Sequence, residues 1–136
     1  MRELKFRAWD KKRKRMFAVT TLNASGAVSV FIDDAGLYLL PAEQIELMQY
    51  IGFKDKKGKD IYYGDIIKLD GRHARKEDAR IYEVIEDEYY STPTTRTADG
   101  DTGTIFFNAR ATEMYFTVIG NIYENPELCG DENEED

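Results

Sequence analysis

The sequence holds one histidine and one cysteine, two residue types that can supply a base and a nucleophile. His73 lies in GRHARKED, and Cys129 lies just before the acidic C-terminal run DENEED. Nothing near Cys129 in the sequence would hold a thiolate, so we interpret both as incidental, solvated residues. A zinc site needs about four nitrogen or sulfur ligands, which two candidates cannot supply. We therefore expect no catalytic residue and no metal site.

The segment GFKDKKGK, residues 52–59, spaces glycine and lysine much as a phosphate-binding loop does. Such a loop has four residues between its glycines, then Lys followed by Ser or Thr at the start of a helix. Here five residues separate Gly52 from Gly58, Asp60 follows Lys59, and no helix is predicted next. We interpret the segment as a charged hairpin turn in which Gly58 takes a positive φ, and we expect no cofactor.

Carboxylates are abundant, and a buried pair can act as acid and base when its two pKa values are driven apart. The clusters at residues 33–34, 65, 86–88 and 99–101 fall mostly where turns are predicted. Asp in a turn commonly bonds its own backbone. None of them has the ligand spacing of a calcium loop. We expect solvated turn residues here.

A basic block stands out in a chain whose formal net charge is −7. Trp9 and Phe17 flank it, and cations beside aromatic rings can bind single-stranded nucleic acid. An acidic chain is nevertheless a poor general nucleic-acid binder. We keep nucleic-acid or partner contact as an alternative and favour a soluble hairpin tip with both aromatic residues in the core. The block consists of Lys11, Lys12, Arg13, Lys14 and Arg15.

The elements that position these groups are predicted to be strands. Period-two alternation marks residues 4–9, and β-branched and aromatic residues are concentrated in residues 16–22, 27–32, 47–53, 66–69, 80–90, 102–109 and 113–123. Turns are expected at residues 23–26, 33–36, 54–60 and 64–65, a short helical turn at the start of 41–50, and a long polar loop at 91–103. The core should include Phe6, Val84, Ile105, Phe107, Phe116 and Val118. The fold class is mainly β.

Length and composition fit one domain, because 136 residues with 42% hydrophobic side chains can form a core. No apolar run approaches the roughly 20 residues that cross a bilayer. The first residues lack the apolar region of a signal peptide, and one cysteine cannot form an internal disulfide. We expect a cytoplasmic protein without membrane contact. The acidic run should be a disordered tail, because like charges repel one another.

The predicted strand RIYEVIEDEYY, residues 80–90, offers apolar side chains on both faces. Tyr82 and Val84 share one alternation phase, whereas Ile81, Ile85 and Tyr89 share the other. One core covers only one face of such a strand, so a second subunit should cover the other. We therefore expect a closed homo-oligomer with contacts at Ile81, Ile85 and Tyr89.

Three segments, KFRAWDKKRKRM, LMQYIGFKDKKGKDIYYGDIIK and VIGNIYENPEL, together resemble the YopX family, small proteins encoded by bacteriophages and prophages. The third segment is the most specific, and the three span the chain from end to end. Ile51 and Tyr63 depart from the small polar and acidic residues expected there, which we interpret as surface changes. Bends in the chain suit the Gly, Asp, Asn and Pro residues of these motifs. We therefore interpret the motifs as a signature of the fold.

The resemblance implies a largely β protein whose C-terminal portion is a small SH3-like barrel, and self-association. It supplies no enzymatic activity and no catalytic residues. On this basis residues 1–128 form a single β domain, with an N-terminal hairpin or meander at 1–50 and a barrel-like part at 51–128, and 129–136 form the acidic tail. The function expected is that of a non-enzymatic phage or prophage accessory protein. It would contact itself and an unknown host or phage protein in the host cytoplasm. The alternative is a nucleic-acid-associated factor that uses the basic hairpin.

Overall fold

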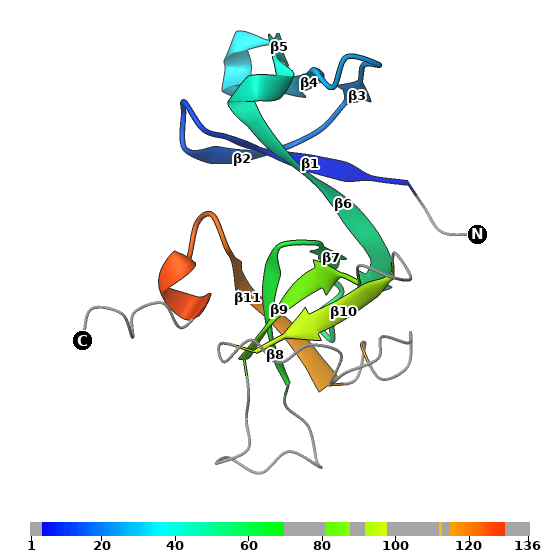
Figure 1. The fold of residues 1–136 in the computed structure, drawn as a ribbon. Coiled ribbons are helices and arrows are strands. Elements are labelled where there is room, and N and C mark those ends of the chain that lie inside the picture. Colours follow the sequence, from blue (N-terminus) through cyan, green and yellow to red (C-terminus); the bar gives the residue numbers. More distant parts are fainter. Residues whose placement is uncertain (1–3, 70–80, 88–91, 98–111, 113–114, 130–136) are drawn as a thin grey trace. The chain divides into compact units, whose positions relative to one another are not determined.

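The computed structural model describes residues 4–69, 81–87, 92–97, 112 and 115–129. The chain divides into two compact units, Met1–Tyr50 and Ile51–Asp136. The elements assigned to the described residues are β-strands and short 3-10 turns (Figure 1), and two described residues, Thr112 and Tyr115, are helical. The prediction of a mainly β fold with at most short helical turns is therefore confirmed. Within the described part of the chain, no helix has the length and apolarity needed to cross a membrane.

The first unit begins with a hairpin. β1 (Phe6–Asp10) pairs with β2 (Arg15–Ala18) in an antiparallel register that sets Asp10 opposite Arg15. Residues 11–14 form the tip, as predicted. On its other side β1 pairs with β6 (Ile45–Lys54), with Phe6 opposite Gln49. The short turn η2 (Ala42–Gln44) leads into β6, which confirms the expected helical turn running into a strand.

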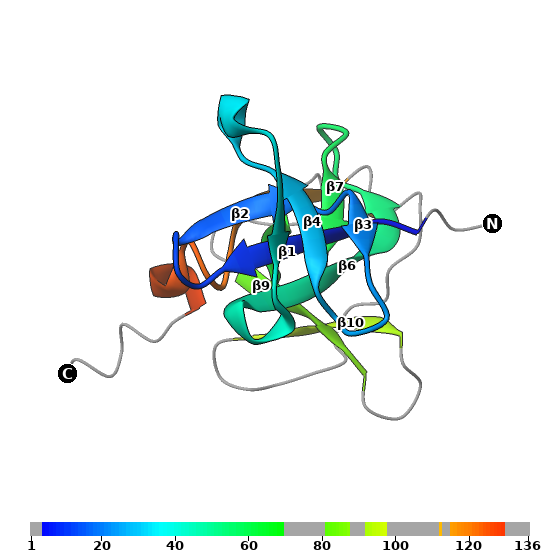
Figure 2. The same ribbon diagram turned by 90° about the horizontal axis from the view of Figure 1, so that it is seen from above.

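A second, three-stranded sheet completes this unit, in the order β3-β4-β5. Its strands are β3 (Thr21–Leu22), β4 (Val28–Phe31) and β5 (Leu37–Leu40), and η1 (Asp33–Ala35) joins the last two. Figure 2 shows β3 and β4 side by side. The predicted strand at 16–22 is in fact divided between β2 and β3, and β5 was not predicted. The core of the unit comprises Ala8, Phe17, Val28, Val30, Ile32, Leu40 and Ile45.

The second unit contains the end of β6, which pairs with β7 (Asp60–Tyr62), and a sheet in the order β10-β9-β8-β11. The members of that sheet are β8 (Asp65–Leu69), β9 (Ile81–Glu86), β10 (Pro93–Arg96) and β11 (Phe116–Asn121). The turn η4 (Pro126–Cys129) follows. The strands curl into a half-barrel, consistent with the small β-barrel expected (Figure 1). Their core comprises Ile51, Ile61, Ile67, Tyr82, Val84 and Phe116.

The predicted core is partly confirmed. Val84 and Phe116 are buried, which fixes the strand phases of β9 and β11 as predicted. Phe6 and Val118 are only half-buried, so the prediction that they are fully buried was wrong, although Val118 packs against the second core. Phe6 is the first residue of β1, and Val118 adjoins the irregularity at which the register of β11 against β8 shifts. Ile105 and Phe107 lie outside the described residues, as does the strand expected at 102–109.

Two further expectations were wrong. Ile51 is fully buried in the second core and Tyr63 packs against it, so neither departure from the family pattern is a surface change. The loop expected at 91–103 contains β10, in which Thr94 and Thr95 are buried. The threonine side chain is polar, which suggested a loop, but it is also β-branched, which suits a strand. The pairing of these residues with β9 makes the segment a strand.

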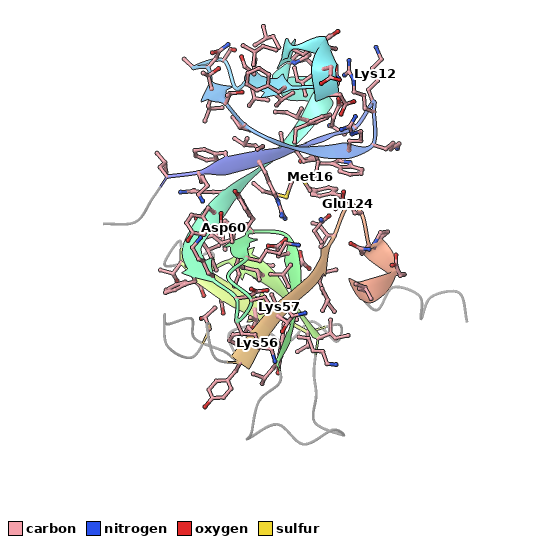
Figure 3. The ribbon with its side chains drawn as sticks, turned by 180° about the vertical axis from the view of Figure 1, so that it is seen from behind. Lys12, Met16, Lys56, Lys57, Asp60 and Glu124 are labelled. Atoms are coloured by element: carbon pink, nitrogen blue, oxygen red, sulfur yellow. The ribbon has the colours of Figure 1, made fainter. Side chains whose placement is uncertain are left out.

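The charged turn at 54–60 is a folded structure built around Asp55. This buried carboxylate accepts hydrogen bonds from the backbone N–H groups of Lys57 and Lys59, both at 2.9 Å. Its second oxygen accepts one from Val118 N–H, also at 2.9 Å. Gly58 has the predicted positive φ, +83°. Figure 3 labels Lys56 and Lys57 on this turn. The segment that resembled a phosphate loop instead ties the β6–β7 turn to β11.

The third family segment, VIGNIYENPEL, also contains a turn that is held by hydrogen bonds among its own residues. The Asn121 side-chain oxygen accepts hydrogen bonds from the N–H groups of Tyr123 and Glu124, at 3.0 and 2.8 Å. The Asn121 N–H in turn donates a hydrogen bond to the Asn125 side-chain oxygen at 3.2 Å. A Cβ on Gly120 would lie 2.5 Å from the Asn125 side-chain oxygen, so only glycine leaves room for this turn. The most specific part of the family resemblance is thus explained by local folding.

Candidate functional site

Asp10 organises the tip of the basic hairpin. Its carboxylate is fully buried and accepts hydrogen bonds from Lys12 N–H (2.9 Å), Arg13 N–H (3.3 Å) and the Gln44 side-chain amide (2.9 Å). Its other oxygen accepts a bond from the Arg13 guanidinium at 2.9 Å. Burial alone would raise the pKa of Asp10, but these bonds to the ionised form outweigh it and hold the pKa below 3.8. The tip is therefore a rigid turn built on one carboxylate.

Most of the positive charge in the block is neutralised within the protein. Arg13 pairs with Asp10, Arg15 forms a bidentate pair with Asp33 at 3.1 Å for both bonds, and Lys11 lies 3.5 Å from Glu46. The hydrogen bonds between Arg15 and Asp33 raise the pKa of Arg15 and lower the pKa of Asp33.

The other two cations of the block are Lys12 and Lys14, and neither has an ion-pair partner among the described residues. Lys12 is labelled at the tip in Figure 3. Lys14 has a positive φ of 59°, and its N–H donates to the Asp10 carbonyl at 2.7 Å. Of the five cations in the block, these two lysines are therefore the ones without an ion-pair partner among the described residues.

The aromatic residues beside the block are not available for stacking on bases. Trp9 and Phe17 are both buried, and the Arg15 guanidinium covers the Phe17 ring at 4.8 Å. Arg13 similarly lies 5.7 Å from the Tyr38 ring centre. Binding of single-stranded nucleic acid combines phosphate contacts with exposed aromatic platforms. The hairpin therefore presents two lysines to a nucleic acid, but neither Trp9 nor Phe17 is exposed for stacking on a base.

The outer face of β9 carries the second set of predicted contact residues. Ile81 is 41% exposed and Ile85 is half-buried, whereas Tyr89 lies outside the described residues. Lys68 lies opposite Ile81, and Glu83 between the two isoleucines pairs with Arg96 at 2.8 Å. The structure therefore brings Ile81 and Ile85 onto one face, but charged side chains interrupt its apolar surface.

His73 lies outside the described residues, and Cys129 is the last residue of η4. Within the described ranges, no group of three or more His, Cys, Asp or Glu side chains is arranged to hold a metal ion.

An exposed apolar face on β4 and β5 was missed by the sequence analysis. The register sets Phe31 opposite Leu37 and Ser29 opposite Leu39, so these side chains share one face of the sheet. The three apolar residues on it are Phe31, Leu37 and Leu39, which are 61%, 57% and 62% exposed. We call them the β4–β5 face. The run LYLL in β5 indicated such a face, because a half-buried strand needs apolar residues only at alternate positions and this run has them at every position.

The family described as YopX protein matches residues 5–129. Among solved structures, EF1440 from Enterococcus faecalis is similar with a TM-score of 0.64 and 22% identity, over 95% of this chain and 99% of that one. The yopX protein from Bacillus subtilis is similar with a TM-score of 0.57 and 23% identity, over 91% and 96%. No curated protein matches. The likeness to both structures supports a shared fold.

Proposed function

This chain belongs to the YopX protein family, and we propose that it is a non-enzymatic phage or prophage accessory protein acting by protein–protein contact in the host cytoplasm. The observation that carries the proposal is the β4–β5 face, which exposes three large apolar side chains on adjacent strands. Contiguous exposed apolar residues commonly mark interaction sites in soluble proteins.

The buried carboxylates support a binding role over catalysis. Asp10, Asp55 and Asp65 are each buried, and each accepts a hydrogen bond from a backbone N–H within three residues of it. A catalytic carboxylate must be able to reach a substrate and exchange a proton with it. These three are committed to holding turns, which is a structural role.

The proposal is tested by capture from phage-infected host cells. Immobilised wild-type protein should retain a protein partner, and Phe31→Lys should lose it, because a charge on the apolar face opposes its burial. Thr21→Lys is the matched control, because Thr21 is exposed and shares the phase of Ser29 on the same sheet. It should retain the partner as the wild type does.

The alternative is a nucleic-acid-associated factor that uses the basic hairpin. Electrophoretic mobility shift across a salt series distinguishes it from the proposed function. We expect no shift with single- or double-stranded nucleic acid at physiological salt, and no change when Lys12 and Lys14 are both replaced by Glu. Tight binding that weakens steeply with salt and disappears in the double variant would support the alternative. Such a result, with no captured protein, would overturn the proposed function.

Self-association through the outer face of β9 is a separate part of the proposal. At micromolar concentration, sedimentation equilibrium should give a mass above that of the 15.7 kDa chain. Ile81→Lys should shift the equilibrium towards the monomer, whereas Ile119→Lys, at an exposed position of β11, should not. A single 15.7 kDa species for the wild type would contradict self-association.

A further inference from the structure

We propose that the open edge of β5 binds an extended segment of another protein by strand addition. The segment would carry apolar residues at alternate positions and basic residues beyond its ends. This inference rests on the proposed function, for which it names the surface and the chemistry of the partner. It is drawn from the backbone of β5, from the side chains of the β4–β5 face and from the charges beside them.

The backbone of β5 is open to pairing on one side. β5 is the last strand of its sheet, and no described strand pairs with it there (Figure 1). Ile32 N–H donates to the Gly36 carbonyl at 3.0 Å, which sets the hydrogen-bonding phase of the hairpin. In antiparallel strands, residues bonded to the partner alternate with residues whose backbone groups point away. The N–H and C=O groups of Leu37 and Leu39 therefore face the open edge.

The side chains favour an apolar strand as the occupant. Proteins usually protect an exposed edge with lysine, proline, a bulge or a covering segment. The β5 sequence LYLL contains neither lysine nor proline, and its register with β4 is regular. An added strand would place every second side chain beside Leu37 and Leu39, continuing the β4–β5 face onto the partner. Cross-strand apolar pairs of this kind stabilise a sheet.

The charges at the two ends of β5 favour a basic partner. Asp34 lies in the turn before the strand, and Glu43 lies in the turn after it. Both are exposed, and neither forms an ion pair with another described residue. Asp33 is already paired with Arg15. Lysine or arginine beyond the ends of an incoming strand would complement these two carboxylates.

The same charges disfavour a second copy of this chain. Two-fold pairing of β5 with itself, centred on the strand, would bring the Asp34 end of each copy against the Glu43 end of the other. Like charges would then face each other at both ends of the pairing. A partner of different sequence and opposite charge avoids this repulsion.

The test is fluorescence anisotropy with the full chain and a short labelled peptide. The peptide has valine at alternate positions, threonine between them and lysine at both ends. The wild type should bind it saturably, and Leu37→Lys or Leu39→Lys should weaken binding by about tenfold or more. These side chains are mostly exposed, so both variants should remain folded. Thr21→Lys, near the opposite edge of the same sheet, should stay within about twofold of the wild type.

Two altered peptides test the mode of binding. Glutamate in place of the terminal lysines should weaken binding about tenfold, and N-methylation of alternate amides should abolish it, because strand addition needs main-chain donors. The inference is overturned if the wild type does not bind, or if the lysine variants or altered peptides bind equally well. It is also overturned if the wild type self-associates in sedimentation equilibrium and Leu39→Lys does not, because the occupant would then be a second copy.

Failure of this inference can be told apart from failure of the proposed function. If a partner is captured from infected cells equally by the wild type and by Leu39→Lys, contact with proteins stands and the β5 edge is not its site. If the wild type captures no protein and shifts nucleic acid instead, the proposed function itself fails.

Discussion

Phe116→Ala should lower the free energy of unfolding by about 3–5 kcal/mol, as expected for a large aromatic side chain removed from a packed core. Phe116 is 2% exposed and packs with the β-branched residues of the second core. Domains of this size are stable by only about 5–15 kcal/mol, so the loss is a large fraction of the total. Urea unfolding followed by tryptophan or tyrosine fluorescence measures it.

Ile119 provides the control for Phe116. It lies on the same strand, β11, and is 36% exposed, so Ile119→Ala should cost less than about 1 kcal/mol. A loss at Phe116 as small as that at Ile119 would mean that β11 does not present Phe116 to the core, and the strand phase would be wrong.

Asp10→Asn should lower the free energy of unfolding at neutral pH by about 1–3 kcal/mol, the range for hydrogen bonds to a charged group. The amide can accept hydrogen bonds at its single oxygen only and cannot form an ion pair with the Arg13 guanidinium. The hydrogen bonds hold the pKa of Asp10 below the ordinary value of 3.8 in the folded state. The carboxylate therefore contributes stability above about pH 4, and that contribution is lost as the pH falls through the lower folded pKa.

The measurement is urea unfolding of both proteins between neutral pH and about pH 2. The difference in unfolding free energy between the wild type and Asp10→Asn should be constant near neutral pH and shrink below about pH 4. Asp34→Asn, at an exposed position without an ion pair among the described residues, should change the free energy of unfolding at neutral pH by less than about 0.5 kcal/mol. A difference that persists unchanged to the lowest pH would show that the charge on Asp10 is not what matters.

Local patterns predicted the elements that depend on near neighbours in the sequence. The basic hairpin, the turn at Gly58 and the helical turn before β6 are each specified within a few residues. The phases of β9 and β11 followed from alternation, because one buried face selects one phase.

Features that depend on distant residues were not predictable. Gln44 reaches Asp10 across 34 positions, and Asp33 reaches Arg15 across 18. The sequence shows five consecutive cations, but it does not show that the distant carboxylates Asp33 and Glu46 neutralise two of them. Similarly, β10 becomes a strand because β9 lies beside it, although its own residues suggest a loop. The run LYLL shows more apolar residues than a half-buried strand needs, but only the pairing with β4 and the packing of the sheet determine which leucines point outwards.

The long strand β6 has a consequence for how this family can diverge. The boundary between the two units falls inside it, between Tyr50 and Ile51, so one uninterrupted strand serves both. Its first half is fixed in register by β1, and its second half is fixed by β7. A one-residue insertion or deletion at the boundary would turn every side chain on one half to the opposite face. β6 can therefore change in residue type but hardly in length.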